Sequence, residues 1–219
     1  MRDWPEAMFH ITGHAIDDMH CFADRRDKGE FLDRFARVVG SEPTRDPVRR
    51  EPRPWLRPEA SLVAYCVLDN HYHVLVRQRV AGGAGRVMRS VLRSYGDYFN
   101  KKYGRKKTPV FEPPYGVRRI GSSRQGRRAL MYVNLNFEPD PLGYEFSSHG
   151  VYVGKRRSSM IDTDSGLWFF GGSQLEYERA IIDEGLPALE QKIAARGPGV
   201  RRNPLRYGPG DHILRPQAK

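Results

Sequence analysis

Cysteine is scarce in this chain of 219 residues, which has only Cys21 and Cys66. Two cysteines so far apart form neither a disulfide framework nor the paired spacing of a zinc site. Cys66 lies in an apolar run and is interpreted as a small buried side chain. No apolar run approaches the length that crosses a membrane, and the first residues lack the apolar region of a signal peptide. We therefore expect a cytoplasmic protein with no membrane partner.

Acidic residues are outnumbered, 26 against 37 basic ones, which gives a net charge of +11 and a pI near 9.9. Such an excess is typical of a surface that binds phosphate groups, although a merely soluble basic protein can also carry it. The length favours one main domain with appendages. We expect a domain over residues 1–155, with a Pro/Arg-rich insertion near 41–59. Residues 156–219 are expected to form a partly helical extension with a loosely ordered end.

Two histidines separated by one residue, His71 and His73, begin an apolar run after the strand-like segment 61–68. The junction Asp69-Asn70 between the two segments is short enough for a β-hairpin. Alternate side chains of a strand share a face, so His71 and His73 should project together. Two neutral imidazoles on a rigid sheet supply half of a metal site. The alternative is that both are ordinary polar residues on a solvated face.

Apolar periodicity predicts the order strand, helix, strand, strand, helix, strand, helix. The expected strands cover residues 8–16, 61–68, 71–77 and 115–120, and the expected helices 29–39, 86–103 and 123–136. This order indicates an α+β fold, a ferredoxin-like split βαβ sandwich with an antiparallel sheet, an appended last helix and a C-terminal tail. The strand with the histidines can lie centrally in such a sheet. After the main domain, residues 168–170 are expected to dock on the core and residues 174–184 to form a short helix.

The last predicted helix of the main domain carries polar residues four positions apart, at Arg124, Arg128, Tyr132 and Asn136. This spacing places them along one stripe, beside an apolar stripe that would bind the sheet. Arginine suits bidentate phosphate binding, and an amide oxygen suits a hard divalent ion. Tyr132 could instead be a half-buried core residue, as most tyrosines are.

Several ordered motifs now point to a known family. They are the early strand 9–16, Ala64-Tyr65-Cys66-Val67-Leu68-x-Asn70-His71-x-His73-Val74-Leu75-Val76, Tyr95-x-x-Tyr98-Phe99-Asn100, Met131-Tyr132-Val133-Asn134-Leu135-Asn136, and Phe146-Ser147-Ser148 followed by Tyr152-x-Gly154. Together they span about residues 9–185 and resemble the HUH single-tyrosine transposases of insertion sequences, most closely their REP-associated tyrosine transposase branch.

The resemblance implies that Tyr132 is a nucleophile and that His71, His73 and Asn136 bind Mg²⁺ or Mn²⁺. It implies cleavage and rejoining of single-stranded DNA near a hairpin through a 5′-phosphotyrosine, which conserves the phosphodiester energy so that no ATP is needed. The ion would neutralise charge on the scissile phosphate, and the ion or Arg128 would stabilise the phenolate.

The chain departs from the family pattern at two places. It has Leu68-Asp69 where the family usually has Met-Pro, and Asn136-Phe137-Glu138-Pro139 where the family usually has Asn-Pro-Val. The first change could alter the turn before the histidines, and the second could shift the end of the tyrosine helix. Neither removes a proposed catalytic group, so an active metal site is still expected.

Tyr95 and Tyr98 are rival nucleophiles, because they lie in another aromatic cluster. Tyr95 belongs to the apolar stripe of its helix, which favours a core position, and Tyr98 has no amide one turn away. Tyr132 is therefore the preferred nucleophile.

The expected partner is single-stranded or hairpin DNA, bound by a monomer or a homodimer. Basic side chains near the site elements are the predicted contacts: Arg86, Arg89, Arg93, Lys101, Lys102, Arg105, Lys106, Lys107, Arg118, Arg119, Arg124 and Arg128. Tyr115 and Phe111 are predicted to stack on bases. A non-catalytic hairpin-binding regulator and a metal-dependent RNA-processing nuclease remain alternatives on the same fold.

Overall fold

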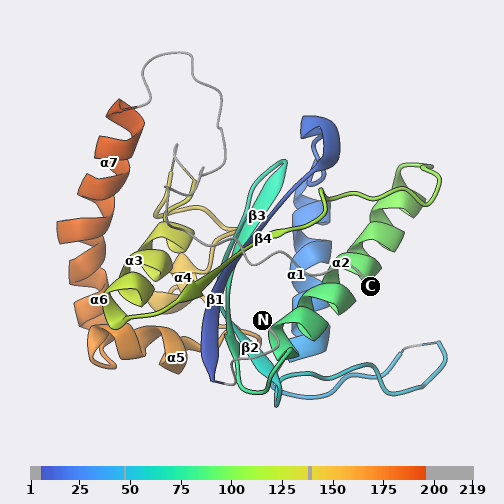
Figure 1. The fold of residues 1–219 in the computed structure, drawn as a ribbon, viewed down its shortest axis with the longest axis horizontal. Helices are drawn as coiled ribbons and strands as arrows, with labels where there is room; N and C mark the ends of the chain where they lie inside the picture. The colour runs from blue at the N-terminus through green and yellow to red at the C-terminus, as the bar shows by residue number, and fades with distance from the viewer. Residues whose placement is uncertain (1–5, 47, 138–139, 196–219) are drawn as a thin grey trace.

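Four antiparallel strands form one sheet at the centre of the molecule (Figure 1). The computed structural model describes residues 6–46, 48–137 and 140–195, so the expected loosely ordered end of the extension, from residue 196 on, lies outside the described residues. The strands are β1 (Ala7–His14), β2 (Ala60–Val67), β3 (His71–Gln78) and β4 (Gly116–Ile120), in the spatial order β2-β3-β1-β4. With α1 (Arg25–Val39) after β1 and α2 (Gly83–Lys102) after β3, this is the predicted ferredoxin-like arrangement, and β3 is central as expected.

Helices cover both faces of the sheet (Figure 1). On one face lie α1 and α2, and on the other α3 (Ser123–Asn134) packs against β2 and β3. The rest of the chain lies on the α3 side: α4 (His149–Tyr152), α5 (Thr163–Leu167), η2 (Trp168–Phe170), α6 (Gln174–Ala180), η3 (Ile181–Gly185) and α7 (Leu186–Ala194). A short turn of 3-10 helix, η1 (Ile16–Asp18), follows β1. No helix among the described residues is both long and apolar enough to cross a bilayer.

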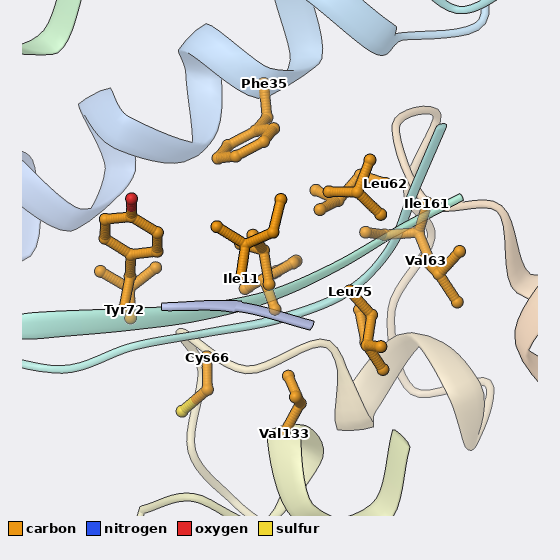
Figure 2. Close-up of a cluster of buried hydrophobic side chains, with 14 of the residues drawn as sticks. Ile11, Phe35, Leu62, Val63, Cys66, Tyr72, Leu75, Val133 and Ile161 are labelled. Carbon is orange, nitrogen blue, oxygen red and sulfur yellow. The ribbon is translucent and has the colours of Figure 1, made fainter. Parts of the chain in front are cut away.

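Alternation along the central strands divides the side chains between these two layers. Tyr72 points toward α1, whereas Cys66 and Leu75 point toward Val133 of α3 (Figure 2). Because both faces are covered, β2 is buried along its whole length, and Cys66 is fully buried as predicted. Gly13 is required opposite Tyr72, since a Cβ there would lie 2.5 Å from the tyrosine ring.

Capping side chains explain where two helices begin. Helix α1 begins at Arg25, four residues before the predicted start, because the Asp24 carboxylate accepts a hydrogen bond from the Asp27 backbone N–H. Helix α3 begins after Ser122, whose hydroxyl accepts from the Gln125 N–H, in agreement with the prediction. It ends at Asn134 rather than Asn136.

The segments outside the sheet were predicted less well. Among its described residues, the insertion at 41–59 contains no helix or strand, as expected of a loop. The helix predicted at 174–184 changes to a π-helical turn after Ala180, and the chain then continues into α7. Phe170 is buried and docks on the core as expected, but Trp168 is 65% exposed.

A buried polar network joins α3 to the helices packed behind it. The Tyr177 hydroxyl of α6 accepts a hydrogen bond from Asn134 Nδ2 at 2.9 Å and lies 3.0 Å from His149 Nδ1. The Ser148 hydroxyl donates to Asn134 Oδ1. Buried polar groups satisfied in this way fix the elements that carry them. The network therefore sets the position of α3, the helix that carries Tyr132.

Candidate active site

Four histidines from two adjacent strands gather on the sheet face that α3 covers. His71 and His73 lie on β3, and His10 and His14 lie on β1. The antiparallel register places His14 directly opposite His71, and their rings stack with centroids 4.9 Å apart. The rings of His10 and His73 also stack, at 5.3 Å. His71 and His73 share a face as predicted, with their rings 5.2 Å apart.

Hydrogen bonds orient the rings of both β3 histidines. Nδ1 of His71 lies 2.8 Å from Oδ1 of Asn70 in the hairpin turn, and Nδ1 of His73 lies 3.1 Å from Nε2 of His10. Because Nδ1 is engaged in each ring, metal binding by these rings would use Nε2. A ligating histidine is usually held through its other nitrogen in this way.

Burial keeps the inner histidines uncharged. Desolvation, followed by the neighbouring Arg118 guanidinium, lowers the pKa of His10 to about 4. Desolvation also holds the pKa of His73 well below its ordinary value, with smaller contributions from His10 and His71. Neutral imidazole is the form that ligates a metal. These histidines are therefore buried and paired, not polar residues on a solvated face.

A complete metal site would need a ligand beyond the histidines, aspartates, glutamates and cysteines. Within the described part of the chain, no three or more of these side chains are grouped so that they could hold an ion. The His71–His73 pair fits two positions of a divalent site, and the remaining positions suit an amide oxygen, water or a phosphate. Asn136, the predicted amide ligand, follows the end of α3 and lines a cavity together with Tyr132.

Tyr132 lies between the histidines and the C-terminal helix. Its half-buried ring meets His73 edge-on with centroids 5.4 Å apart, and His10 at 5.8 Å. On the other side, Lys192 Nζ of α7 lies 4.4 Å from the ring centre and 3.4 Å from the hydroxyl oxygen. The tyrosine and the histidines that it meets belong to the same chain. The arrangement brings a phenol, a cation and a pair of imidazoles to one place.

The cavity beside Tyr132 has a volume of about 430 Å³ and lies between α3 and α7. Its apolar lining comes from Met131, Leu135, Gly185, Ala188 and Leu189, and its polar lining from Arg128, Tyr132, Asn136, Glu184 and Lys192. The Glu184 carboxylate is paired with Arg127 at 2.6 Å, which lowers its pKa. Arg128 and Lys192 are the other charged side chains of the lining, and both are cations.

The rival tyrosines lie on the opposite side of the sheet, on α2. Tyr95 is fully buried and donates to the Cys21 carbonyl, so the core interpretation is confirmed. The Tyr98 hydroxyl lies 2.9 Å from Asp27, and desolvation, followed by that hydrogen bond, raises its pKa to about 12. Both positions disfavour a role beside the histidines.

The predicted DNA contacts do not form one groove between the two site elements. Arg86, Arg89 and Arg93 line a 420 Å³ groove on α2, and Arg93, Lys107 and Tyr115 line an adjoining groove of 810 Å³. Because α2 covers the face opposite the histidines, these side chains lie away from Tyr132. Arg118, opposite His10 on β4, belongs to the histidine face. Lys101, Lys106, Arg119, Arg124 and Arg128 are exposed.

Three of the residues predicted to contact DNA also make contacts within the protein. The Lys102 amine lies 2.7 Å from both Asp24 and the buried Asp27, so it holds α1 to α2. Arg105 packs over the Phe99 ring, with its guanidinium carbon 5.4 Å from the centroid. Phe111 was expected to stack on bases, but its ring contacts the core rings Phe22, Phe31, Tyr72 and Tyr95. Its ring contacts are thus with the core.

The sequence interpretation missed three neighbours of Tyr132 and the histidine pair. His10 and His14 are four residues apart in a predicted strand, so the alternation used for His71 and His73 would have placed them on one face. Only the pairing of β1 with β3 brings them to that pair. The position of Lys192 beside Tyr132 could not be predicted, because nothing in the local sequence indicates that α7 returns to α3.

Comparison with known proteins gives a distant structural likeness. No family model matches the chain. No curated protein matches it either. A solved structure described as a REP-associated tyrosine transposase bound to a REP hairpin is similar over 69% of this chain and 82% of that chain, with a TM-score of 0.49 and 13% sequence identity.

Proposed function

We propose that this protein cleaves and rejoins single-stranded DNA near a hairpin, as a tyrosine transposase or nicking enzyme with Tyr132 as the nucleophile. The observation that carries the proposal is the contact of the Tyr132 ring with His73, at 5.4 Å between centroids, within one chain. Two imidazoles, His73 and His10, and the Lys192 amine surround this ring, which is unusual for a tyrosine that serves only the core. The ordered motifs that resemble the HUH single-tyrosine transposases support the same assignment.

The proposed step is an in-line displacement at phosphorus. The Tyr132 phenol loses its proton to solvent, and its oxygen forms a bond to the phosphorus of a phosphodiester as the bond to the 3′-oxygen breaks. The leaving oxygen takes up a proton as a 3′-hydroxyl, and the 5′-phosphate stays on the tyrosine. Attack by another 3′-hydroxyl reverses these changes and reseals the strand. Lys192 Nζ, 3.4 Å from the phenol oxygen, would stabilise the phenolate.

A divalent ion, Mg²⁺ or Mn²⁺, is proposed to bind Nε2 of His71 and His73 together with the Asn136 amide oxygen. When bound, it would neutralise charge on the scissile phosphate. The chain itself prepares the ligands: Asn70 and His10 orient the two imidazoles, and burial keeps His73 neutral. Because the tyrosine and the histidines lie in one chain, we propose that a monomer is sufficient for cleavage.

Strand binding is proposed to begin with electrostatic attraction between the phosphate backbone and a chain of net charge +11. Arg128 and Lys192 are the cations that line the cavity of Tyr132. The arginines of α2 are on the far face, so we assign them to a more distant part of the bound DNA, not to the scissile phosphate.

The test is incubation with labelled single-stranded DNA that carries a hairpin, in the presence of Mn²⁺, followed by a denaturing gel. We expect a covalent protein–DNA adduct that is lost in Tyr132→Phe and retained in Tyr98→Phe, which removes the rival hydroxyl. Hairpin binding without any adduct would favour the regulator, and cleavage of RNA without an adduct would favour the nuclease. Either result would contradict the proposal.

A further inference from the structure

The cavity between α3 and α7 has the size and lining of a small-ligand site. Its volume of about 430 Å³ falls within the range of roughly 300–1,000 Å³ that is usual for such sites. Met131 and Leu135 of the α3 segment face Ala188 and Leu189 of α7 across it. Two apolar walls from neighbouring helices suit a flat, largely apolar group such as an aromatic ring.

One polar group beside this cavity is unsatisfied. Nδ2 of Asn136 is buried, and no acceptor among the described residues lies within hydrogen-bonding distance of it. A buried donor without an acceptor destabilises the fold, so a partner for it is expected. Because Asn136 lines the cavity, its amide can turn Nδ2 toward a ligand there that offers a carbonyl oxygen or a ring nitrogen.

The charge of the lining identifies the rest of the ligand. Arg128 and Lys192 line the cavity, and the one carboxylate in the lining, Glu184, is neutralised by Arg127. Lys192 also lies against the hydroxyl of Tyr132. A negatively charged group attached to the ring would therefore lie between these cations and the proposed nucleophile.

We propose that this cavity binds a nucleoside phosphate: a base between α3 and α7 that accepts a hydrogen bond from Asn136, and a phosphate at Arg128 and Lys192. This inference rests on the proposed function, because it takes the nucleotide to be one that adjoins the phosphate attacked by Tyr132 in a DNA strand. Base binding there would give the protein a sequence preference at the cleavage point. The Asn136 amide can turn its oxygen to the ion and its nitrogen to the base.

The first experiment measures ligand binding to the full chain without any cleavage, by saturation-transfer NMR. The probes are the four deoxynucleoside 5′-monophosphates, deoxyribose 5-phosphate and inorganic phosphate. We expect at least one monophosphate to bind about tenfold or more tightly than deoxyribose 5-phosphate. Equal binding of the probes with and without a base would overturn the inference.

Two variants on α7 locate the binding. Ala188→Trp fills the cavity from an exposed position, and Gln191→Trp adds the same ring on α7 outside the cavity. Ala188→Trp should abolish the preference for a base, and Gln191→Trp should preserve it. Asn136→Leu should weaken base binding about tenfold with little effect on deoxyribose 5-phosphate. Unchanged binding to Ala188→Trp, with circular dichroism showing the native fold, would refute the cavity as the site.

A second arm distinguishes a strand from a free nucleotide. A single-stranded pentanucleotide with the preferred base should displace the monophosphate and bind at least tenfold more tightly, since its other phosphates add contacts. A monophosphate that outcompetes the strand would overturn the assignment to DNA. Failure of the proposed function has a different signature: nucleotide binding would persist in the cavity while no covalent adduct formed.

Discussion

His10→Phe should weaken metal binding without removing any proposed ligand. The substitution deletes Nε2, which lies 3.1 Å from His73 Nδ1, and keeps an aromatic ring stacked on His73 and near Tyr132. For His73 to offer Nε2 to an ion, its Nδ1 must carry the proton and donate it to His10. Without that acceptor, the His73 ring loses both its preferred tautomer and its orientation.

Two magnitudes follow from this geometry. Removing a hydrogen bond that orients a metal ligand typically costs 10–100-fold in affinity, about 1.4–2.8 kcal/mol. His73 is 3% exposed, so its Nδ1 would remain buried without this partner, and unfolding without metal should become easier by about 1–3 kcal/mol. The affinity loss concerns the site alone, whereas the stability loss concerns the whole fold.

The assay is a calorimetric Mn²⁺ titration of the wild type, His10→Phe and the control His20→Phe, with urea unfolding of each apo protein. His20 is exposed, so its variant should match the wild type in both measurements. If His10→Phe lost stability as expected but bound Mn²⁺ within twofold of the wild type, His10 would serve only the fold. That result would refute the reasoning about ligand orientation.

Three further predictions concern the scaffold of the site, and each is checked by urea unfolding. Tyr177→Phe removes the hydroxyl shared by Asn134 and His149 and should destabilise the protein by about 1–3 kcal/mol. A change below about 0.5 kcal/mol, the size expected of a neutral surface substitution, would contradict the claim that this network stabilises the fold. Gly13→Ala places a Cβ 2.5 Å from the Tyr72 ring and should cost about 1–3 kcal/mol, whereas an unaltered midpoint would mean that the ring moves freely. Burial, followed by the charge of a nearby lysine, lowers the pKa of His149 to about 4. The contribution of neutral His149 to stability is therefore complete above about pH 6.5 and is lost as the pH falls toward 4, by up to about 3 kcal/mol. His149→Gln should flatten this part of the pH profile of unfolding, and an unchanged profile would exclude His149 as its source.

The fold could be predicted from the sequence because its signals are local. Apolar alternation in β2 and β3, the short turn at Asp69-Asn70 and the cap at Ser122 each depend on neighbouring residues. Their order then restricts the topology to a few arrangements, of which the ferredoxin-like sheet is one. Helix ends were less accurate, because capping by Asp24 and the end of α3 depend on single hydrogen bonds.

The site could be predicted only in part, because its remaining members come from distant segments. Alternation placed His71 and His73 on one face, but the register of β1 against β3 decides that His10 meets His73. Lys192 reaches Tyr132 across 60 residues of chain. The basic residues were grouped by their nearness in sequence, yet α2 and α3 lie on opposite faces of the sheet, which separates them in space.

The most direct test of the central claim is to identify the residue that becomes linked to DNA. The full chain is incubated with Mn²⁺ and single-stranded hairpin DNA, digested with nuclease and protease, and its peptides are sequenced by mass spectrometry. The account predicts a nucleotide joined through a 5′-phosphate to Tyr132, formed by the wild type and absent when His73 is replaced by alanine. A nucleotide on any other residue, or none on a folded protein that binds the DNA, would contradict it.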